Sequence, residues 1–306
     1  MIVAAGLTPA WQQIMCFDGL RPGEVNRAID VHWCASGKVL NVAVALAHLG
    51  APAETIALLG GAAGEQIDRE FTSLGIARRW IETHHATRIC TTLIDRRTAQ
   101  VTELVENAGP VTHGELEQFR NVYAEGAAEA QFVILTGSLP AGAPRTFFRE
   151  LLRATPCPAI LDIRGEDLLA ALAGRPFLVK PNREELAHTL VRELTTDAQL
   201  HGAMRELHDR GAQWVVVSQG AAGAWASGEG QLFRLSTPKV AVVNPIGSGD
   251  CLAAGLAWGL SEGQPPRDAL RLAMAAAVEN VTQLLPARLD PELVRRRSDT
   301  ILVEPV

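Results

Sequence analysis

Residues 244–260 read NPIGSGDCLAAGLAWGL, a glycine-containing turn that leads directly into a helix of small residues. Gly247 and Gly249 flank Ser248 in this turn. A helix N-terminus carries unpaired N–H groups and the positive end of the helix dipole, so it binds anions readily. Glycines allow a phosphate to approach the backbone closely. We therefore expect the N–H groups of this turn to form an anion site.

Asp250 follows the turn, although a carboxylate repels the anion that the glycines admit. The residue makes chemical sense as a base that takes a proton from an attacking hydroxyl while the N–H groups hold the developing charge. A simpler explanation is that an acidic residue in a first turn stabilises the helix dipole. The turn lacks the lysine of a Walker A loop, and Leu252 stands where a dinucleotide fingerprint requires glycine. From this stretch alone, both roles of Asp250 stay open.

The composition is that of a globular protein with an ordinary charge content. The chain has 306 residues, of which 47% are hydrophobic, and 28 basic against 34 acidic residues give a net charge of −6. No basic run exceeds Arg295–Arg297, so nucleic acid is not an expected partner. The five cysteines form no CxxC pair, and no apolar run reaches membrane-spanning length. These features favour a soluble, cytoplasmic protein without a membrane partner, whose apolar N-terminus is a buried strand and not a signal peptide.

Short apolar segments alternate with helical patterns along the chain. The segments are MIVAAGL (1–7), TIALLGG (55–61), FVILTGS (132–138), AILDIRG (159–165), PFLVKPN (176–182) and WVVVSQG (214–220). Buried strands that alternate with helices predict an α/β fold with a mostly parallel sheet covered on both faces. Ligands bind such sheets at the carboxyl ends of the strands. We expect one α/β domain over residues 1–306.

Two stretches break the alternation of strands and helices. Residues 11–35 and 86–106 carry alternating patterns, such as EVNRAIDVHW, with no helical pattern between them. We interpret both as strands of a small separate sheet that acts as a lid. An exposed apolar face of such a sheet usually finds a partner.

The turn before Asp250 resembles the C-terminal signature of the PfkB, or ribokinase-like, family of carbohydrate kinases. Further resemblances occur in the family's order: ASGKVLNVAVALAHLG (35–50), TGSLPAG (136–142), LVKPNREEL (178–186) and VVVSQGAAG (215–223). The GSLP and KPNREEL forms are similar to the branch that phosphorylates already phosphorylated ketohexoses, which includes 1-phosphofructokinase and tagatose-6-phosphate kinase. The resemblance implies a ribokinase-like fold, ATP and Mg²⁺ as cofactors, and a homodimer that pairs through its lids.

The resemblance assigns roles on the nucleotide side of the site. Asp250 is then the catalytic base. Ser218, Gly220 and Gly223 belong to a loop for the ATP phosphates and ribose. Asn182 and Glu185 stand at the family's Asn-x-x-Glu spacing, which places an amide and a carboxylate on one helix face to orient waters around Mg²⁺. The same two residues also fit a capping box, and both roles are compatible.

The acceptor side requires its own polar groups. Lys38 follows a turn at Gly37, and Asn41 lies one helical turn later, where its amide can reach sugar hydroxyls. In the hexose-phosphate branch, the positions that match Arg27, Arg88 and Ser138 contact the phosphate that the substrate already carries. Guanidinium groups suit that task because they bind phosphate through two parallel hydrogen bonds.

The chain departs from the family pattern where the sugar is expected to bind. The family's first strand ends in Asn-Pro-x-x-Asp, whereas this chain reads TPAWQQ, so Gln12 takes the place of an aspartate that holds sugar hydroxyls. Val39 replaces the second glycine of the Gly-Lys-Gly turn, and Trp11 adds an aromatic surface nearby. We therefore expect intact phosphoryl transfer with altered sugar recognition.

The leading hypothesis is a kinase that phosphorylates a phosphorylated ketohexose such as fructose 1-phosphate or tagatose 6-phosphate. The nearest alternative is a kinase of an unphosphorylated sugar or nucleoside, against which Lys38, Arg27 and Arg88 argue. A non-catalytic sugar-binding protein on the same fold is a third alternative. The pairing of Asp250 with the Asn182 and Glu185 motif argues against it, because a pure binder has no need of a base.

Overall fold

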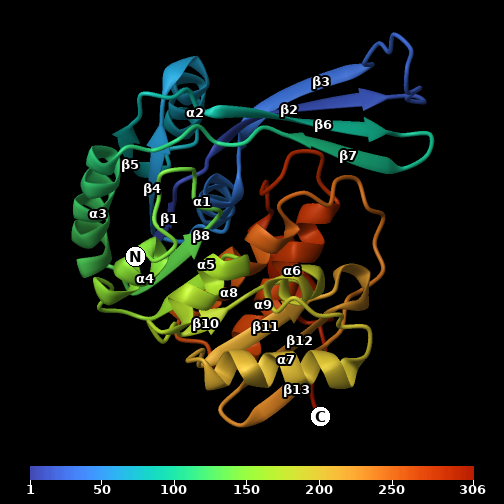
Figure 1. Ribbon diagram of the computed structural model, residues 1–306. Coiled ribbons are helices and arrows are strands. Elements are labelled where there is room, and N and C mark those ends of the chain that lie inside the picture. The colour runs from blue at the N-terminus through green and yellow to red at the C-terminus, as the bar shows by residue number, and fades with distance from the viewer.

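The computed structural model, which describes residues 1–306, is built on a large central sheet (Figure 1). In spatial order its ten strands are β14 (Val303–Pro305), β13 (Gln231–Leu235), β12 (Ala224–Gly228), β11 (Trp214–Ser218), β10 (Leu178–Val179), β9 (Ala159–Asp162), β8 (Phe132–Thr136), β1 (Ile2–Gly6), β4 (Ala53–Leu59) and β5 (Ala77–Glu82). The strands from β11 to β5 are parallel, and β12, β13 and β14 add an antiparallel edge. The expected mostly parallel sheet is confirmed, and each of the six apolar segments contributes one of its strands.

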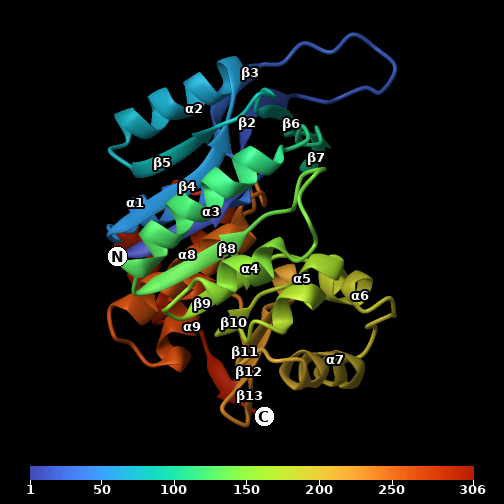
Figure 2. The ribbon, with the colours of Figure 1, turned by 60° about the vertical axis from the view of Figure 1, so that its left-hand side comes forward.

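Helices cover both faces of this sheet (Figures 1 and 2). One face carries α1 (Lys38–His48), α2 (Gly61–Ser73), α8 (Ser248–Ser261), α9 (Pro266–Val281) and α10 (Pro291–Ser298). The other carries α3 (His113–Ala128), α4 (Phe147–Arg153), α5 (Gly165–Leu172), α6 (Arg183–Thr189) and α7 (Asp197–Asp209). Alternate residues of β1 enter the two cores, Ile2 on the first face and Val3 on the second. This two-sided burial explains why the strand sequences are continuously apolar.

Helix α8 is buried along most of its length, which accounts for its small residues. It packs against α9, and a Cβ added at Gly255 would lie 2.9 Å from the Cβ of Ala276. A larger side chain there would push the two helices apart. The close packing of α8 against α9 holds the helix N-terminus, and therefore the turn before Asp250, in a defined position.

A separate four-stranded sheet stands beside the main layers (Figure 1). Its spatial order is β3 (Asp30–Ser36), β2 (Ala10–Phe17), β6 (Arg88–Asp95) and β7 (Gln100–Val105). The strands come from the two stretches that the sequence pattern singled out. β2 starts soon after β1 ends, and β6 follows β5, so the small sheet rises from the carboxyl ends of main-sheet strands.

None of the helices combines the length and the hydropathy that crossing a bilayer requires.

Candidate active site

The turn before α8 has the geometry of an anion site. Gly247 adopts a left-handed conformation with φ of 83°, and a Cβ added there would lie 3.0 Å from the Cβ of Pro286. The left-handed conformation favours glycine, and the close Pro286 contact leaves little room for a larger residue. The backbone N–H groups of Gly249 and Asp250 donate to no acceptor in the chain. They are therefore free to bind an anion at the positive end of the helix dipole.

Asp250 lies buried at this helix terminus, with 6% of its surface exposed. Its Oδ2 accepts a hydrogen bond from Nδ2 of Asn41 at 2.7 Å, and Oδ1 of Asn41 accepts one from the Ser36 hydroxyl at 3.1 Å. Burial, followed by the negative charge of Asp162, raises the pKa of Asp250 to about 7. Oδ1 of Asp250 makes no hydrogen bond in the chain. This oxygen can accept a proton near neutral pH.

A cluster of charged side chains lies next to Asp250. Nζ of Lys38 lies 2.9 Å from Oδ1 of Asp162 and 3.4 Å from Oε1 of Glu185. Nζ of Lys180 lies 3.4 Å from the same Asp162 oxygen, and both Asp162 and Lys180 are almost fully buried. A Cβ added at Gly249 would lie 3.2 Å from Nζ of Lys180, so this cluster borders the anion site.

The charges in this cluster stabilise one another. Burial by itself would raise the pKa of Asp162, but Lys180 and Lys38 outweigh burial and lower it. Burial would lower the pKa of Lys38, but Asp162, Glu185 and Asp250 outweigh burial and raise it. Asp162 and Lys38 are therefore both charged at neutral pH. Oδ2 of Asp162 is buried and has no hydrogen-bond partner in the chain.

Asn182 and Glu185 form the capping box of α6. Oδ1 of Asn182 accepts from the Glu185 N–H at 2.7 Å, and Oε2 of Glu185 accepts from the Asn182 N–H at 2.9 Å. Oε1 of Glu185 remains directed toward Lys38. Asn182 also forms a β-bridge with Ser218, which brings the Asn-x-x-Glu motif next to the loop after β11.

These residues fit an indirectly bound Mg²⁺. No three His, Cys, Asp or Glu side chains come together as a direct metal site. Mg²⁺ retains several waters and typically binds one or two carboxylates together with substrate phosphates. The Glu185 carboxylate, the Asn182 amide and the unpartnered Oδ2 of Asp162 supply oxygen donors of that kind.

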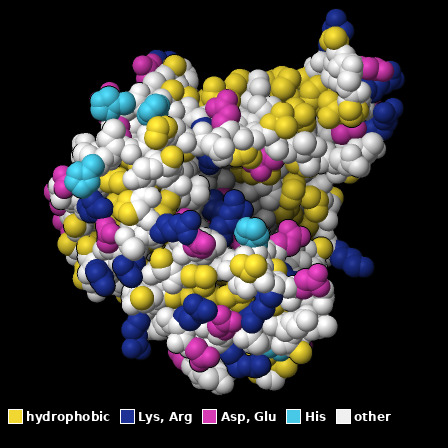
Figure 3. Space-filling view, viewed as in Figure 1, with side chains coloured by type: hydrophobic (Ala, Val, Ile, Leu, Met, Phe, Trp, Pro, Cys, Tyr) yellow, Lys and Arg dark blue, Asp and Glu magenta, His cyan; other side chains and the backbone are white.

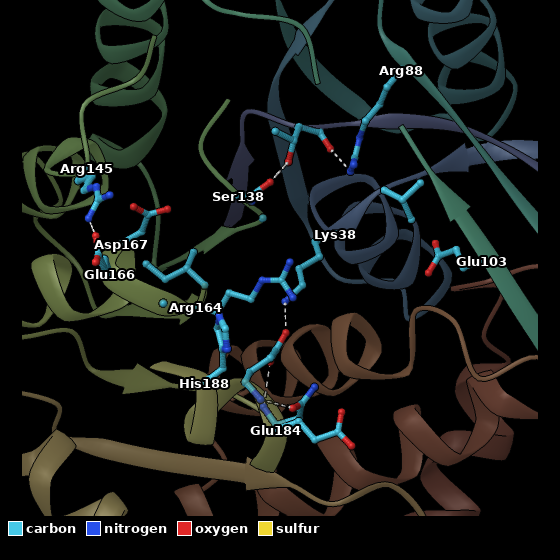
Figure 4. A pocket seen from close by; sticks show the side chains of 17 residues that line it. Lys38, Arg88, Glu103, Ser138, Arg145, Arg164, Glu166, Asp167, Glu184 and His188 are labelled. Carbon is cyan, nitrogen blue, oxygen red and sulfur yellow. Dashed lines mark hydrogen bonds and ion pairs between the residues drawn. The ribbon is translucent and has the colours of Figure 1, made fainter. Parts of the chain in front are cut away.

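A polar cavity of about 950 Å³ opens between the small sheet and the main layers. Figure 3 shows it as a hollow with Lys and Arg side chains in its floor. Of the residues predicted for the site, Lys38, Arg88, Ser138, Asn182 and Glu185 line it (Figure 4).

A second cavity, of about 470 Å³, lies at the N-terminus of α8. Its polar end is formed by Ser218, Gly220 and Gly223 together with Ser248 and Gly249. The remaining wall is largely apolar and includes Val240, Val242, Leu252, Met274 and Val278. Gly223 has φ of 90°, a conformation that favours glycine. An apolar slot that ends at free N–H groups suits a nucleoside with phosphates.

The structure places the predicted acceptor-side residues in different ways. Gln12 lies on the inner face of the small sheet, 2% exposed, and its Nε2 donates to Oγ1 of Thr92 at 2.7 Å. Gly37 is the N-cap of α1, directly before Lys38. The hydroxyl oxygen of Ser138 lies 3.3 Å from that of Thr8, within hydrogen-bond distance.

The two predicted arginines differ most from the sequence-based picture. Arg88 lines the cavity, but three of its nitrogens donate to the carbonyl oxygens of Thr8, Pro9 and Glu106. Arg27 is exposed in the loop between β2 and β3 and does not line the polar cavity. That loop projects away from the main layers (Figure 1), so one chain does not bring Arg27 to the other residues.

Sequence reasoning missed several charged residues of the site, among them Asp162 and Lys180 of the buried cluster and Arg164 in the lining of the polar cavity. Asp162 ends the apolar strand β9, and Lys180 directly follows β10. A charged residue at the carboxyl end of a buried strand was a usable signal, because parallel strands bring such ends to one edge of the sheet.

Comparison with known proteins agrees with this architecture. A model of the pfkB family of carbohydrate kinases matches residues 2–292. The tetrameric inhibited form of phosphofructokinase-2 from Escherichia coli superposes with a TM-score of 0.89 at 26% identity, over 98% of each chain. The same enzyme in complex with fructose 6-phosphate gives 0.87 at 25% identity, over 98% of this chain and 99% of that one. A possible 1-phosphofructokinase from Thermotoga maritima shares the fold, with a TM-score of 0.89 at 21% identity over the whole of both chains.

The family match spans nearly the whole chain, and its fold neighbours include phosphofructokinases. The predicted resemblance is confirmed. The chain belongs to the pfkB family of carbohydrate kinases and is a kinase of a sugar or sugar phosphate.

Proposed function

We propose that the protein transfers the γ-phosphoryl group of ATP to a hydroxyl of a phosphorylated ketohexose, with Mg²⁺ as the metal. The observation that carries this proposal is the position of Asp250. It is a buried carboxylate with a pKa of about 7, next to free N–H groups. Its neighbours Ser248 and Gly249 line the largely apolar cavity, and Lys38, whose charge acts on it, lines the polar one.

In this proposal the apolar cavity takes the nucleoside of ATP. Ser218, Gly220 and Gly223 hold its ribose and phosphates, and the free N–H groups of Gly249 and Asp250 hold the phosphoryl group that is transferred, because the Ser248 N–H already donates to the Pro245 carbonyl. Asn182 and Glu185 would hold Mg²⁺ through water, and the metal when bound would neutralise phosphate charge.

Oδ1 of Asp250 accepts the proton of the acceptor hydroxyl while the hydroxyl oxygen bonds to the γ-phosphorus. The bond between the γ-phosphorus and the bridging oxygen breaks, and ADP leaves with the electron pair. The Asn41 hydrogen bond holds the carboxylate so that Oδ1 faces the acceptor. Lys38 and Lys180, held by Asp162, provide positive charge beside the transferred group.

The polar cavity takes the acceptor. Only two of its lining residues, Val105 and Ile163, are hydrophobic, which suits a sugar with many hydroxyls and a phosphate. Arg88 and Ser138 line this cavity and are proposed to contact the phosphate. Gln12, Asn41 and Gly37 lie outside the lining, and the family resemblance is the basis for proposing that they contact the sugar. The E. coli neighbour in complex with fructose 6-phosphate supports a phosphorylated ketohexose as the acceptor class.

We propose as well that residues 1–306 act as one catalytic domain with the small sheet as its lid, and that lids pair in a homodimer. One face of the small sheet exposes Val31, Trp33, Ile89 and Leu104, each by 39% or more. The register places Trp33 and Leu104 on the same face, through Gln13 and Thr91. An apolar face of this kind is stabilised by a partner, and Arg27 would reach a cleft only from a partner's lid.

The test measures ADP release with ATP, Mg²⁺ and a panel of acceptors. The panel contains fructose 1-phosphate, fructose 6-phosphate, tagatose 6-phosphate and their unphosphorylated sugars. We expect a higher kcat/KM for at least one sugar phosphate than for its unphosphorylated sugar. A preference for unphosphorylated sugars would contradict the acceptor class. An absence of acceptor-dependent ADP release across sugars and sugar phosphates would contradict the proposed reaction.

A further inference from the structure

Arg164 is the arginine of the polar cavity that has no partner. It follows Ile163 after the end of β9 and forms the N-cap of α5, and its side chain is exposed. Its carbonyl oxygen accepts from the Leu168 N–H, but its side chain makes no hydrogen bond or ion pair with another residue, so all five guanidinium donors are free. In the view of Figure 4 its side chain extends from the main sheet into the middle of the cavity, toward Lys38.

The other cations of this cavity already have partners. Lys38 contacts Asp162 and Glu185, and Arg145 forms an ion pair with Glu166. Arg88 uses three of its nitrogens on backbone carbonyls. These contacts hold the cavity walls together, and a ligand would have to compete with them.

The charge of the lining also makes Arg164 important for an anionic ligand. Five carboxylates line the cavity, from Glu103, Glu166, Asp167, Glu184 and Glu185, against four Lys and Arg side chains. Without Arg164 only three of those cations would remain. A phosphate carries −1.5 to −2 charges near pH 7, so it would then enter a strongly repulsive site.

We infer that Arg164 binds the phosphate that the acceptor carries and so sets the preference for a phosphorylated sugar. This inference rests on the proposed function and adds a specificity residue to it. A guanidinium offers two parallel N–H donors that match two phosphate oxygens. Arg164 lines the polar cavity together with Thr8 and Ser138 but does not line the apolar cavity proposed for the nucleotide. The acceptor's phosphate is therefore a better match for its position than the phosphates of ATP.

The test compares wild type, Arg164→Ala and Arg164→Lys with the matched control Arg145→Ala, which removes an already paired arginine from the same cavity. We expect Arg164→Ala to raise KM for the best sugar phosphate about ten- to a hundredfold, because a hydrogen bond to a charged group is lost. KM for ATP and the activity on the unphosphorylated sugar should stay within twofold of wild type. The thermal midpoint of unfolding should stay within a few degrees. Arg164→Lys should recover part of the loss. Calorimetric titration of the nucleotide-free protein with the sugar phosphate should show the same weakening.

Three outcomes would overturn the inference. An unchanged KM with a lowered kcat would place Arg164 on the transferred phosphoryl group. An equal rise in KM for Arg145→Ala would show that the loss of any positive charge in the cavity weakens sugar-phosphate binding, without a specific contact by Arg164. Unchanged kinetics and binding would leave Arg164 as a solvated side chain. A wild type that shows no preference for sugar phosphates would instead refute the proposed acceptor class, before any variant is compared.

Discussion

Replacing Asp250 by asparagine tests the proposed base with the least change in shape. The amide keeps the volume of the buried side chain and can still accept the Asn41 hydrogen bond, 2.7 Å long in the wild type. It cannot take a proton from the acceptor hydroxyl. We expect kcat to fall by about 10² to 10⁴, the usual loss for a positioned general base, with KM for ATP nearly unchanged.

The same substitution has a stability effect whose sign follows from the pKa. Burial and Asp162 raise the pKa of Asp250 from 3.8 to about 7, so the folded state holds a proton that the unfolded chain releases. Ionisation of this group therefore lowers the free energy of unfolding as the pH rises from about 4 to 7. At about 1.4 kcal/mol for each tenfold change in acidity, the loss between pH 4.5 and pH 8 is about 3 kcal/mol. The asparagine variant avoids this loss.

The assay combines ADP release with urea unfolding at pH 4.5 and pH 8. The wild-type kcat/KM should rise with pH and level off above about 7, whereas the residual activity of the variant should lack that rise. The stability of the variant relative to wild type should increase by about 3 kcal/mol over the same pH interval. A variant with kcat within tenfold of wild type would refute Asp250 as the base. A stability difference that is independent of pH would refute the raised pKa.

Further predictions concern the metal, the sugar and the assembly. Glu185→Gln should raise the Mg²⁺ concentration for half-maximal activity about tenfold, since a carboxylate holds Mg²⁺ better than an amide. Glu184→Gln is the control, and an equal effect of both variants would contradict the assignment of Glu185 to the metal. Gln12→Asp should raise kcat/KM for ketohexose phosphates several-fold, because charge-assisted hydrogen bonds to sugar hydroxyls are stronger; a loss on every ketohexose phosphate tested would show that Gln12 does not contact the sugar. Trp33→Asp, at a side chain 43% exposed and stacked on Trp11 at 6.1 Å, should lower the molecular mass in sedimentation equilibrium, and an unchanged mass would argue against pairing through the small sheet.

The sequence by itself predicts the architecture because the governing signals are local. Continuous apolar segments such as residues 214–220 are long enough to be strands and too apolar to be half-exposed, so they predict parallel strands covered on both sides. The alternating pattern of residues 86–106 predicts the small sheet in the same way. The sequence also predicts the anion-binding turn at Gly247, because its glycines and the aspartate that follows are adjacent in the chain.

The sequence could not show which side chains already have partners, because those partners are distant along the chain. Arg88 looks like a free phosphate ligand in the sequence, yet it donates to the carbonyl of Thr8, which is 80 positions away. Lys38 meets Asp162 across 124 positions, and Asn41 meets Asp250 across 209. The raised pKa of Asp250 likewise depends on burial and on Asp162, neither of which its neighbours in the sequence determine. Local patterns determine strands, turns and caps, whereas only tertiary packing decides which charges are buried together and which cation of the cavity is left for a ligand.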